Sequence, residues 1–160
     1  MASRDELQRA VARHNHYRAK HNAQPLIWDS ELAASAQRWA DRGVFEHSQP
    51  DGAYGENNAL GCKDAEAATI AFYDEVAQYD FNRQGFSLAT GHFTQVVWKG
   101  TQRIGIGIGQ AGGRRFHVFH YAPAGNMQGC FESNVEPPRP SQQRLSAPPG
   151  SASAAHAKQA

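Results

Sequence analysis

The chain has 160 residues, of which 40% are hydrophobic, and a formal net charge of +1. This size and composition suit one domain with its own core. The balanced charge argues against nucleic acid as the main partner, because phosphate binding needs a concentrated basic surface. No apolar run approaches the roughly 20 residues that a membrane-spanning helix needs.

The first ten residues, MASRDELQRA, lack the apolar region of a secretory signal. An intracellular location, in the cytosol or on the cytosolic face of membranes, is therefore the simplest expectation, and secretion is the alternative if the sequence is a processed form. The two cysteines, Cys62 and Cys130, are too few for a disulfide-stapled scaffold. They could form one bridge, but we expect both as thiols in a reducing compartment.

The first predicted helix follows Ser3, which forms a capping-box pattern with Glu6. Polar residues share its inward stripe with apolar ones, and His14 lies one turn before Arg18. A buried polar network that ties the helix to a loop explains these two residues better than catalysis does. The stripe consists of Leu7, Val11, His14, Tyr17, Arg18 and His21.

Beyond a helix-breaking proline, Leu26, Ile27 and Trp28 are expected to anchor a loop by burial. A second helix is predicted to begin at residues 29–30, which are good N-caps, and to end near Gly43. Its apolar face consists of Leu32, Ala33, Ala36, Trp39 and Ala40.

Residues 44–64 form a long irregular stretch rich in Gly, Pro, Asn and Asp. A loop of about twenty residues inside a compact domain is unusual and often functional. It contains His47 and Glu56. Taken alone, His47 is best explained as an exposed loop residue and Glu56 as a carboxylate that stabilises a turn.

A third helix is predicted from about Asp64, with Glu75 on its inward face. A carboxylate on an apolar face costs free energy unless it is paired, hydrogen-bonded or protonated, so a histidine partner would explain it. The apolar stripe is Ala68, Phe72, Val76 or Glu75, and Tyr79. The nearby aromatic residues Tyr73, Tyr79, Phe81 and Phe86 are expected to pack in the core and at its rim.

Residues 91–98, GHFTQVVW, predict a short buried helix in which Phe93, Val96 and Val97 share one face. His92 stands at its start, and a histidine at a helix terminus is usually structural when taken alone.

The period then changes to two. Isoleucines at 104, 106 and 108 alternate with glycines, which predicts a strand whose bare face lets a helix or another backbone approach closely. A hairpin turn at 111–113 leads into a second strand at 115–121. One face of this strand carries Phe116, Val118 and His120, and the other carries His117, Phe119 and Tyr121. From about residue 137 apolar periodicity ends, so we predict one domain over 1–137 and a disordered tail over 138–160.

Together these segments resemble the CAP superfamily, which groups cysteine-rich secretory proteins, antigen 5 and plant pathogenesis-related proteins. GHFTQVVW at 91–98 and HVFHYAPAGNM at 117–127 resemble its two signatures, and HNHYR at 14–18 and GEN at 55–57 its smaller motifs. The FESNVEPP ending and the few cysteines are most similar to the Golgi-associated plant pathogenesis-related branch. The resemblance implies an α+β fold, a three-layer α-β-α sandwich with a small antiparallel sheet.

By motif match, the resemblance implies a cavity formed by His47, Glu56, Glu75 and His92. His47 and His92 would bind Zn²⁺ or another divalent cation. Glu56 and Glu75, the candidate catalytic residues, would hold a water or a histidine tautomer. The remaining motif positions are implied to be structural: His14, Asn15, Arg18, Tyr121, Pro123, Gly125 and Asn126.

Three functions follow as hypotheses. The first is a non-catalytic protein that binds sterol, fatty acid or acidic phospholipid at a membrane surface. The second is a metal-dependent hydrolase or protease, although the sequence contains neither HExxH nor GxSxG and Ser48 is close to His47 in sequence alone. The third is a protein-interaction module of defence or signalling type that could form a homodimer. The resemblance favours the first and third, and therefore a role that is not enzymatic.

Overall fold

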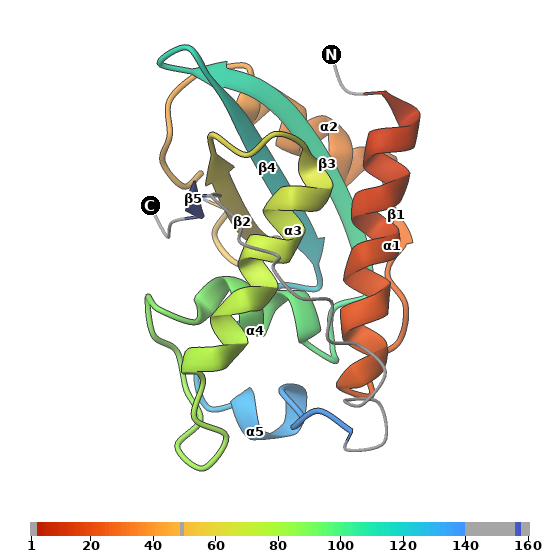
Figure 1. The fold of residues 1–160 in the computed structure, drawn as a ribbon, viewed down its shortest axis with the longest axis vertical. Helices are drawn as coiled ribbons and strands as arrows, with labels where there is room; N and C mark the ends of the chain where they lie inside the picture. Colours follow the sequence, from red (N-terminus) through yellow and green to blue (C-terminus); the bar gives the residue numbers. More distant parts are fainter. Residues whose placement is uncertain (1–2, 49, 140–155, 158–160) are drawn as a thin grey trace.

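The structure is a computed structural model that describes residues 3–48, 50–139 and 156–157. Its elements run from the N-terminus in the order shown in Figure 1. They are α1 (Arg4–Lys20), β1 (Ile27–Trp28), α2 (Ser30–Ala40), β2 (Gly55–Leu60), α3 (Ala65–Asp74), the 3₁₀ turn η1 (Glu75–Gln78), α4 (Gly91–Val97), β3 (Arg103–Ala111), β4 (Arg114–Ala122), α5 (Phe131–Asn134) and β5 (His156–Ala157).

The strands form one sheet in the order β1-β3-β4-β2-β5. Helix α2 covers one face, and α1, α3 and α4 lie on the other (Figure 1). This confirms the predicted α+β sandwich of three layers. The sheet is mixed rather than antiparallel, because β1 pairs in parallel with the start of β3, where Ile27 lies opposite Arg103.

Helix α2 packs directly on the backbone of β3, as the alternating glycines predicted. A Cβ atom at Gly107 would lie 2.4 Å from the backbone nitrogen of Gln37, and one at Gly105 would lie 2.1 Å from that of Ala33. The side chain of Gln37 then bonds both the N–H and the carbonyl of Ile108. The absence of side chains on this face of β3 therefore sets the distance between helix and sheet.

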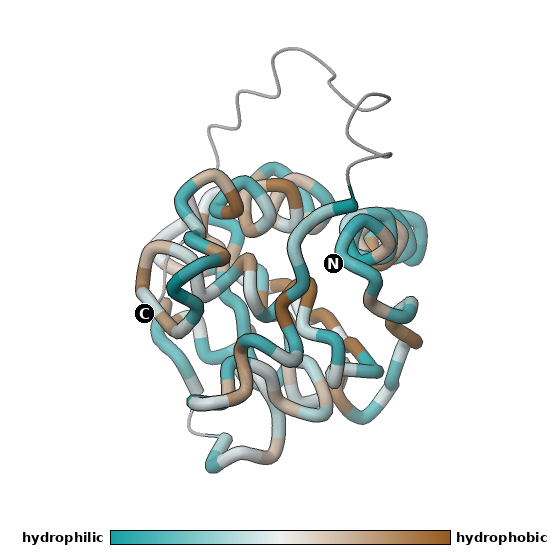
Figure 2. The backbone as a smooth tube through the Cα atoms, turned by 90° about the horizontal axis from the view of Figure 1, so that it is seen from below, coloured by the Kyte–Doolittle hydropathy of each residue, from teal (hydrophilic) through white to brown (hydrophobic). Residues whose placement is uncertain are grey.

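Each face of the sheet has its own apolar core. The smaller core, under α2, contains Ala36, Ala40, Phe116 and Val118. The larger core lies under α1, α3 and α4 and includes Phe72, Phe93, Val96, Val97, Phe119 and Tyr121. Helix α1, seen nearly along its axis beside the N label in Figure 2, mixes hydrophilic and hydrophobic residues around its turns.

The prediction of an irregular segment over 44–64 was wrong in its second half, which forms β2. This strand pairs with β4 along its whole length, from Gly55 opposite Tyr121 to Leu60 opposite Phe116. The sequence GENNAL is poor in residues that favour strands. Pairing with β4 and burial of Asn57, Asn58 and Ala59 outweigh that local preference.

The predicted anchor at residues 26–28 was correct for Leu26 alone. Leu26 is buried, whereas Ile27 and Trp28 are 69% and 39% exposed. Backbone bonds hold this segment instead, because Ile27 N donates to the carbonyl of Gln102 at the edge of the sheet. Two large apolar side chains are thus left on the surface.

The predictions for the first and third helices were close, with differences in the capping of α1 and at the end of α3. Ser3 Oγ accepts from the N–H of Glu6, as a capping box requires, but the carboxylate of Glu6 bonds the N–H of Ala65 instead of returning to Ser3. Helix α3 ends at Asp74, and the predicted stripe continues through η1, which begins at Glu75.

Most of the predicted tail, 138–160, lies outside the described residues. Within it, Arg139 N donates to the carbonyl of Lys20, and β5 pairs with Ala59 and Leu60 of β2, where the sequence predicted no strand. In the described part of the chain, no helix is long and apolar enough to cross a membrane.

Candidate functional site

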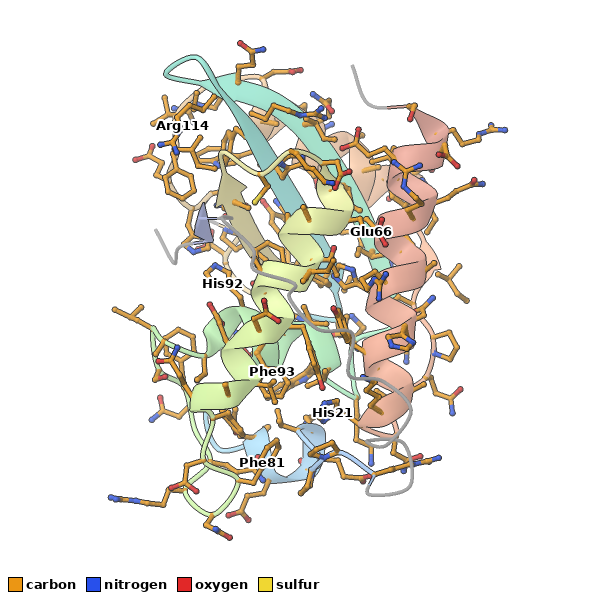
Figure 3. All side chains as sticks on the ribbon, viewed as in Figure 1. His21, Glu66, Phe81, His92, Phe93 and Arg114 are labelled. Atoms are coloured by element: carbon orange, nitrogen blue, oxygen red, sulfur yellow. The ribbon has the colours of Figure 1, made fainter. Side chains whose placement is uncertain are left out.

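His92 lies at the start of α4, every residue of which is buried. Its Nδ1 lies 2.7 Å from Glu75 Oε2, and Glu75 Oε1 accepts from the backbone N–H groups of His92 and Phe93. The imidazole stacks on Phe72 with ring centroids 4.9 Å apart. Figure 3 labels His92 and its neighbour Phe93. Its Nε2 is buried and has no hydrogen-bond partner among the described residues.

Glu56 forms a second histidine–carboxylate pair with His47, whose Nδ1 lies 2.7 Å from Glu56 Oε1. The carboxylate is 3% exposed and accepts further bonds from Ser48 N, Ser48 Oγ, Asn58 Nδ2 and His120 Nε2. Burial alone would raise the pKa of Glu56, but the bonds from His120, His47 and Ser48 outweigh burial and hold that pKa well below its ordinary value.

His120 was not predicted from the sequence to belong to this site. His120 is fully buried opposite Glu56 in the β2–β4 register, with its Nε2 2.7 Å from Glu56 Oε2. Its Nδ1 lies 2.7 Å from Ser35 Oγ of α2, and Tyr54 stacks on its ring at 3.9 Å. A histidine on an otherwise apolar strand face was the available signal, but its partner was hidden because β2 was not predicted.

Both histidine–carboxylate pairs are connected to β2. Glu56 of the first pair belongs to the strand, and His92 of the second pair is bonded to it. Asn57, next to Glu56, donates to the carbonyl of His92 at 3.1 Å. The structure therefore brings the four predicted residues to one strand but groups them as His47 with Glu56 and His92 with Glu75. Among residues 3–48, 50–139 and 156–157, no group of three or more His, Cys, Asp or Glu side chains is arranged to hold a metal.

The donor chemistry nevertheless fits an ion held by two imidazoles and completed by solvent. In both pairs a carboxylate engages Nδ1, the arrangement that orients metal-binding histidines through their second nitrogen. The orphaned Nε2 of His92 is a buried polar atom for which such a ligand would provide a partner.

The first motif, HNHYR, forms the buried polar network that the sequence predicted. His14 bonds the carbonyl of Ala10 through Nδ1 and the hydroxyl of Tyr121 through Nε2. Burial lowers the pKa of His14 to about 4, so the ring is neutral. The guanidinium of Arg18 is buried and donates to the carbonyls of Gln24, Val96, Trp98 and Thr101.

The remaining motif residues fix loops around α4. Asn126 donates to the carbonyl of Gly91 and accepts from Thr94 Oγ1. The N–H of Gly125 donates to Gln95 Oε1, and a Cβ at Gly125 would lie 2.7 Å from Gln95 Nε2. Pro123 accepts from Thr101 Oγ1, and Asn15 bonds both the N–H and the carbonyl of Leu26. Asn126 and Gly125 thus attach the loop after β4 to α4, the helix that carries His92, whereas Asn15 fixes the loop before β1.

The chain is similar to proteins of one known family. The family model of the CAP family, described as the cysteine-rich secretory protein family, matches residues 11–122. Golgi-associated plant pathogenesis-related protein 1 of Homo sapiens is 38% identical over 149 residues, which cover 86% of this chain and 97% of that protein. Protein PRY2 of Saccharomyces cerevisiae is 42% identical over 134 residues, covering 79% of this chain. The chain spans 40% of the length of PRY2.

Solved structures agree with these relatives. The crystal structure of NaASP2 with Zn²⁺ aligns with a TM-score of 0.68 and 26% identity, covering 86% of this chain and 87% of that one. The venom allergen-like protein 4 of Schistosoma mansoni aligns with a TM-score of 0.68 at 22% identity, over 89% of this chain and 99% of that one, and shows the same fold.

Proposed function

This chain belongs to the CAP family of cysteine-rich secretory proteins, and on that premise we propose that it binds lipid and catalyses no reaction. The lipids are sterol, fatty acid or acidic phospholipid, taken up at a membrane surface. The histidine–glutamate centre beside β2 would hold a divalent metal.

An open apolar groove beside α1 carries this proposal. Its volume is about 580 Å³, within the roughly 300–1,000 Å³ of small-molecule sites. Leu7, Val11 and Ala12 of α1 line one side, and the exposed ring of Trp28 lines the other. Arg4 also lines the groove and supplies a cation for an anionic headgroup.

Exposed apolar side chains near α4 support contact with a membrane. Phe86, Leu88 and Met127 are 51%, 71% and 52% exposed. They belong to two loops that meet where Asn126 bonds the carbonyl of Gly91. Exposed apolar groups that gather in this way mark interaction surfaces.

The test is uptake of labelled fatty acid and sterol, together with sedimentation with liposomes that contain acidic phospholipid. We expect Trp28→Ala to reduce uptake and Phe86→Ala to reduce sedimentation. Val44→Ala, which removes another exposed apolar side chain, is the matched control. If the wild-type protein binds no lipid class, the interaction module, with its homodimer, becomes the better hypothesis.

A divalent cation is the second ligand that we propose, and the orphaned Nε2 of His92 favours it. His47 and His92 would bind it through Nε2, while Glu56 and Glu75 hold the opposite nitrogens. When bound, Zn²⁺ would polarise a coordinated water or carbonyl. The crystal structure of NaASP2 is one with Zn²⁺. Calorimetric titration with zinc of the wild type and His92→Ala tests this, and equal affinity would place the metal elsewhere.

The hydrolase alternative has weaker support. Ser48 Oγ donates to Glu56 and contacts the hydroxyl of Tyr54, so it is part of the carboxylate's anchoring. Ser35, His120 and Glu56 are bonded in series, but His120 is fully buried between α2 and the sheet. Ser35 is only partly buried, but its hydroxyl donates to the carbonyl of Leu32 within its own helix.

For location, we propose the cytosolic face of intracellular membranes, on the strength of the nearly full-length similarity to the human Golgi-associated protein. Secretion is the alternative, and the Candida albicans relative named secreted protein RBT4, 36% identical over 130 residues, favours it. Fractionation of cells that express the tagged protein from its own gene distinguishes the two.

A further inference from the structure

We propose that His120 is a positioning residue of the histidine–glutamate centre. Through Glu56 it fixes the ring and the tautomer of His47. This inference rests on the proposed role of His47 as a ligand through Nε2, and it adds a third histidine to a centre in which the motif match placed two.

The direction of each hydrogen bond follows from the chemistry of Glu56. An ionised carboxylate accepts and never donates, so both His47 Nδ1 and His120 Nε2 must donate to it. The proton of a neutral His47 ring is thereby held on Nδ1, and its lone pair on Nε2. The orientation of the Glu56 carboxylate therefore decides which nitrogen of His47 carries the lone pair that a metal ligand needs.

His120 and Ser48 together set that orientation. Glu56 Oε2 accepts from His120 Nε2 at 2.7 Å and from Ser48 Oγ at 2.5 Å, which leaves Oε1 directed at His47. Of the two side-chain groups on Oε2, His120 is the one fixed in a strand. Its place opposite Glu56 in the β2–β4 register prevents it from following the loop that carries His47 and Ser48.

His120 is itself held on its other nitrogen. Its Nδ1 lies 2.7 Å from the hydroxyl of Ser35, which also donates to the carbonyl of Leu32 within α2 at 2.9 Å. Tyr54 covers the ring face at 3.9 Å. A hydrogen-bonded chain therefore runs from Ser35 through His120 to Glu56, with His47 on the opposite side of the carboxylate.

The His92 half of the centre is built differently. Glu75 is held by two backbone N–H groups, those of His92 and Phe93. Glu56 has one backbone donor, Ser48 N, and depends on side chains for the rest. Replacing His120 should therefore disturb His47 and leave His92 unchanged, whereas general loosening of the fold would disturb both.

The experiment measures ¹⁵N chemical shifts of the histidine rings in the metal-free protein, and then zinc affinity. In His120→Leu we expect His47 to change from one tautomer to a mixture, with His92 unchanged and zinc affinity lowered about 10- to 100-fold. His120→Gln keeps a donor for Glu56 and should retain the wild-type tautomer. His117→Gln, on the opposite face of β4, is the matched control.

An unchanged His47 tautomer in folded His120→Leu, with unchanged zinc affinity, would overturn the inference. If the wild-type protein binds no zinc, the metal proposal fails, and the tautomer measurement still decides the role of His120. If His120→Leu does not fold, Ser35→Ala takes its place. It removes the hydrogen-bond partner of His120 Nδ1 and should shift the His47 tautomer in the same direction, and no shift would count against the proposal.

Discussion

The carboxylate of Glu6 in α1 accepts a hydrogen bond of 2.9 Å from the backbone N–H of Ala65, 59 residues away at the start of α3. The same carboxylate pairs with Arg115 of β4. Three elements that are distant in sequence thus meet at one buried side chain. Because an N–H at a helix start has no partner within its helix, a side chain from elsewhere satisfies it.

Glu6→Ala should destabilise the protein by about 1–3 kcal/mol, because it leaves the N–H of Ala65 and the guanidinium of Arg115 without this acceptor. Asp5→Ala is the control, since Asp5 is exposed and pairs with the exposed Arg9 of the same helix. Urea unfolding of both variants measures the difference. Equal effects would show that the Glu6 contact contributes nothing beyond surface charge.

Gly107→Ala should be among the most damaging single-methyl additions. Its Cβ would lie 2.4 Å from the backbone of Gln37, so α2 must move away from the sheet, at a cost of about 1–3 kcal/mol or more. Gly85→Ala is the matched control, because nothing lies within 4 Å of a Cβ there and its backbone suits any residue. A melting temperature unchanged by Gly107→Ala would contradict the close packing of α2.

Glu75→Leu should cost stability as well as ligand binding. The carboxylate accepts from the N–H groups of His92 and Phe93, and a leucine would leave both without their acceptor, at about 1–3 kcal/mol each. Glu75→Gln retains one side-chain acceptor and should be milder. Thermal unfolding of the two variants tests this order of stability. If the cost of burying the charge dominated, Glu75→Leu would be the more stable of the two.

Glu75 also shows how much of the candidate site could be predicted from the sequence. Its place on an apolar stripe predicted a buried carboxylate with a histidine partner, and the structure supplies His92. Glu56 gave no such signal, because its partners depend on strand pairing between GENNAL and β4. Local propensity opposed that pairing, so long-range contacts decided it. The role of His120 was not predicted for the same reason.

Elements whose sequence has a strict periodicity were predicted well. The alternating glycines of β3 predicted a face that a helix or another backbone approaches closely, and α2 does so. The spacing of Phe93, Val96 and Val97 predicted a buried α4. The exposure of Ile27 and Trp28 could not be inferred from the sequence, because hydrophobic side chains usually predict burial. These two residues lie in an edge strand that is held by backbone hydrogen bonds, so their side chains do not need to be buried.

The two cysteines should differ in reactivity. Cys62 is buried, Cys130 is exposed, and the two are not bonded to each other. In the native protein a thiol reagent should modify Cys130 quickly and Cys62 only after unfolding, because the thiolate must be reachable to react. Mass spectrometry after timed labelling measures this. A quantitative Cys62–Cys130 bridge in protein from its native compartment would contradict the prediction of two thiols.

Buried histidines should make the fold sensitive to acid. Burial lowers the pKa of His14 to about 4 and, together with Arg115, lowers that of His117 to about 4. In the unfolded chain a histidine pKa is about 6.5. Between these two pKa values the unfolded state binds protons that the native state does not bind, so the free energy of unfolding falls as pH falls.

The contribution of these histidines is therefore complete above about pH 6.5 and is lost progressively towards pH 4, by up to about 3 kcal/mol for each ring. Urea unfolding at about pH 7.5 and 4.5 measures the loss. His117→Gln removes one of the titrating rings and should flatten the dependence, whereas His16→Gln, at an exposed site on α1, should preserve most of it. A stability that stays constant between the two pH values would show that the native protein takes up these protons without opening its core.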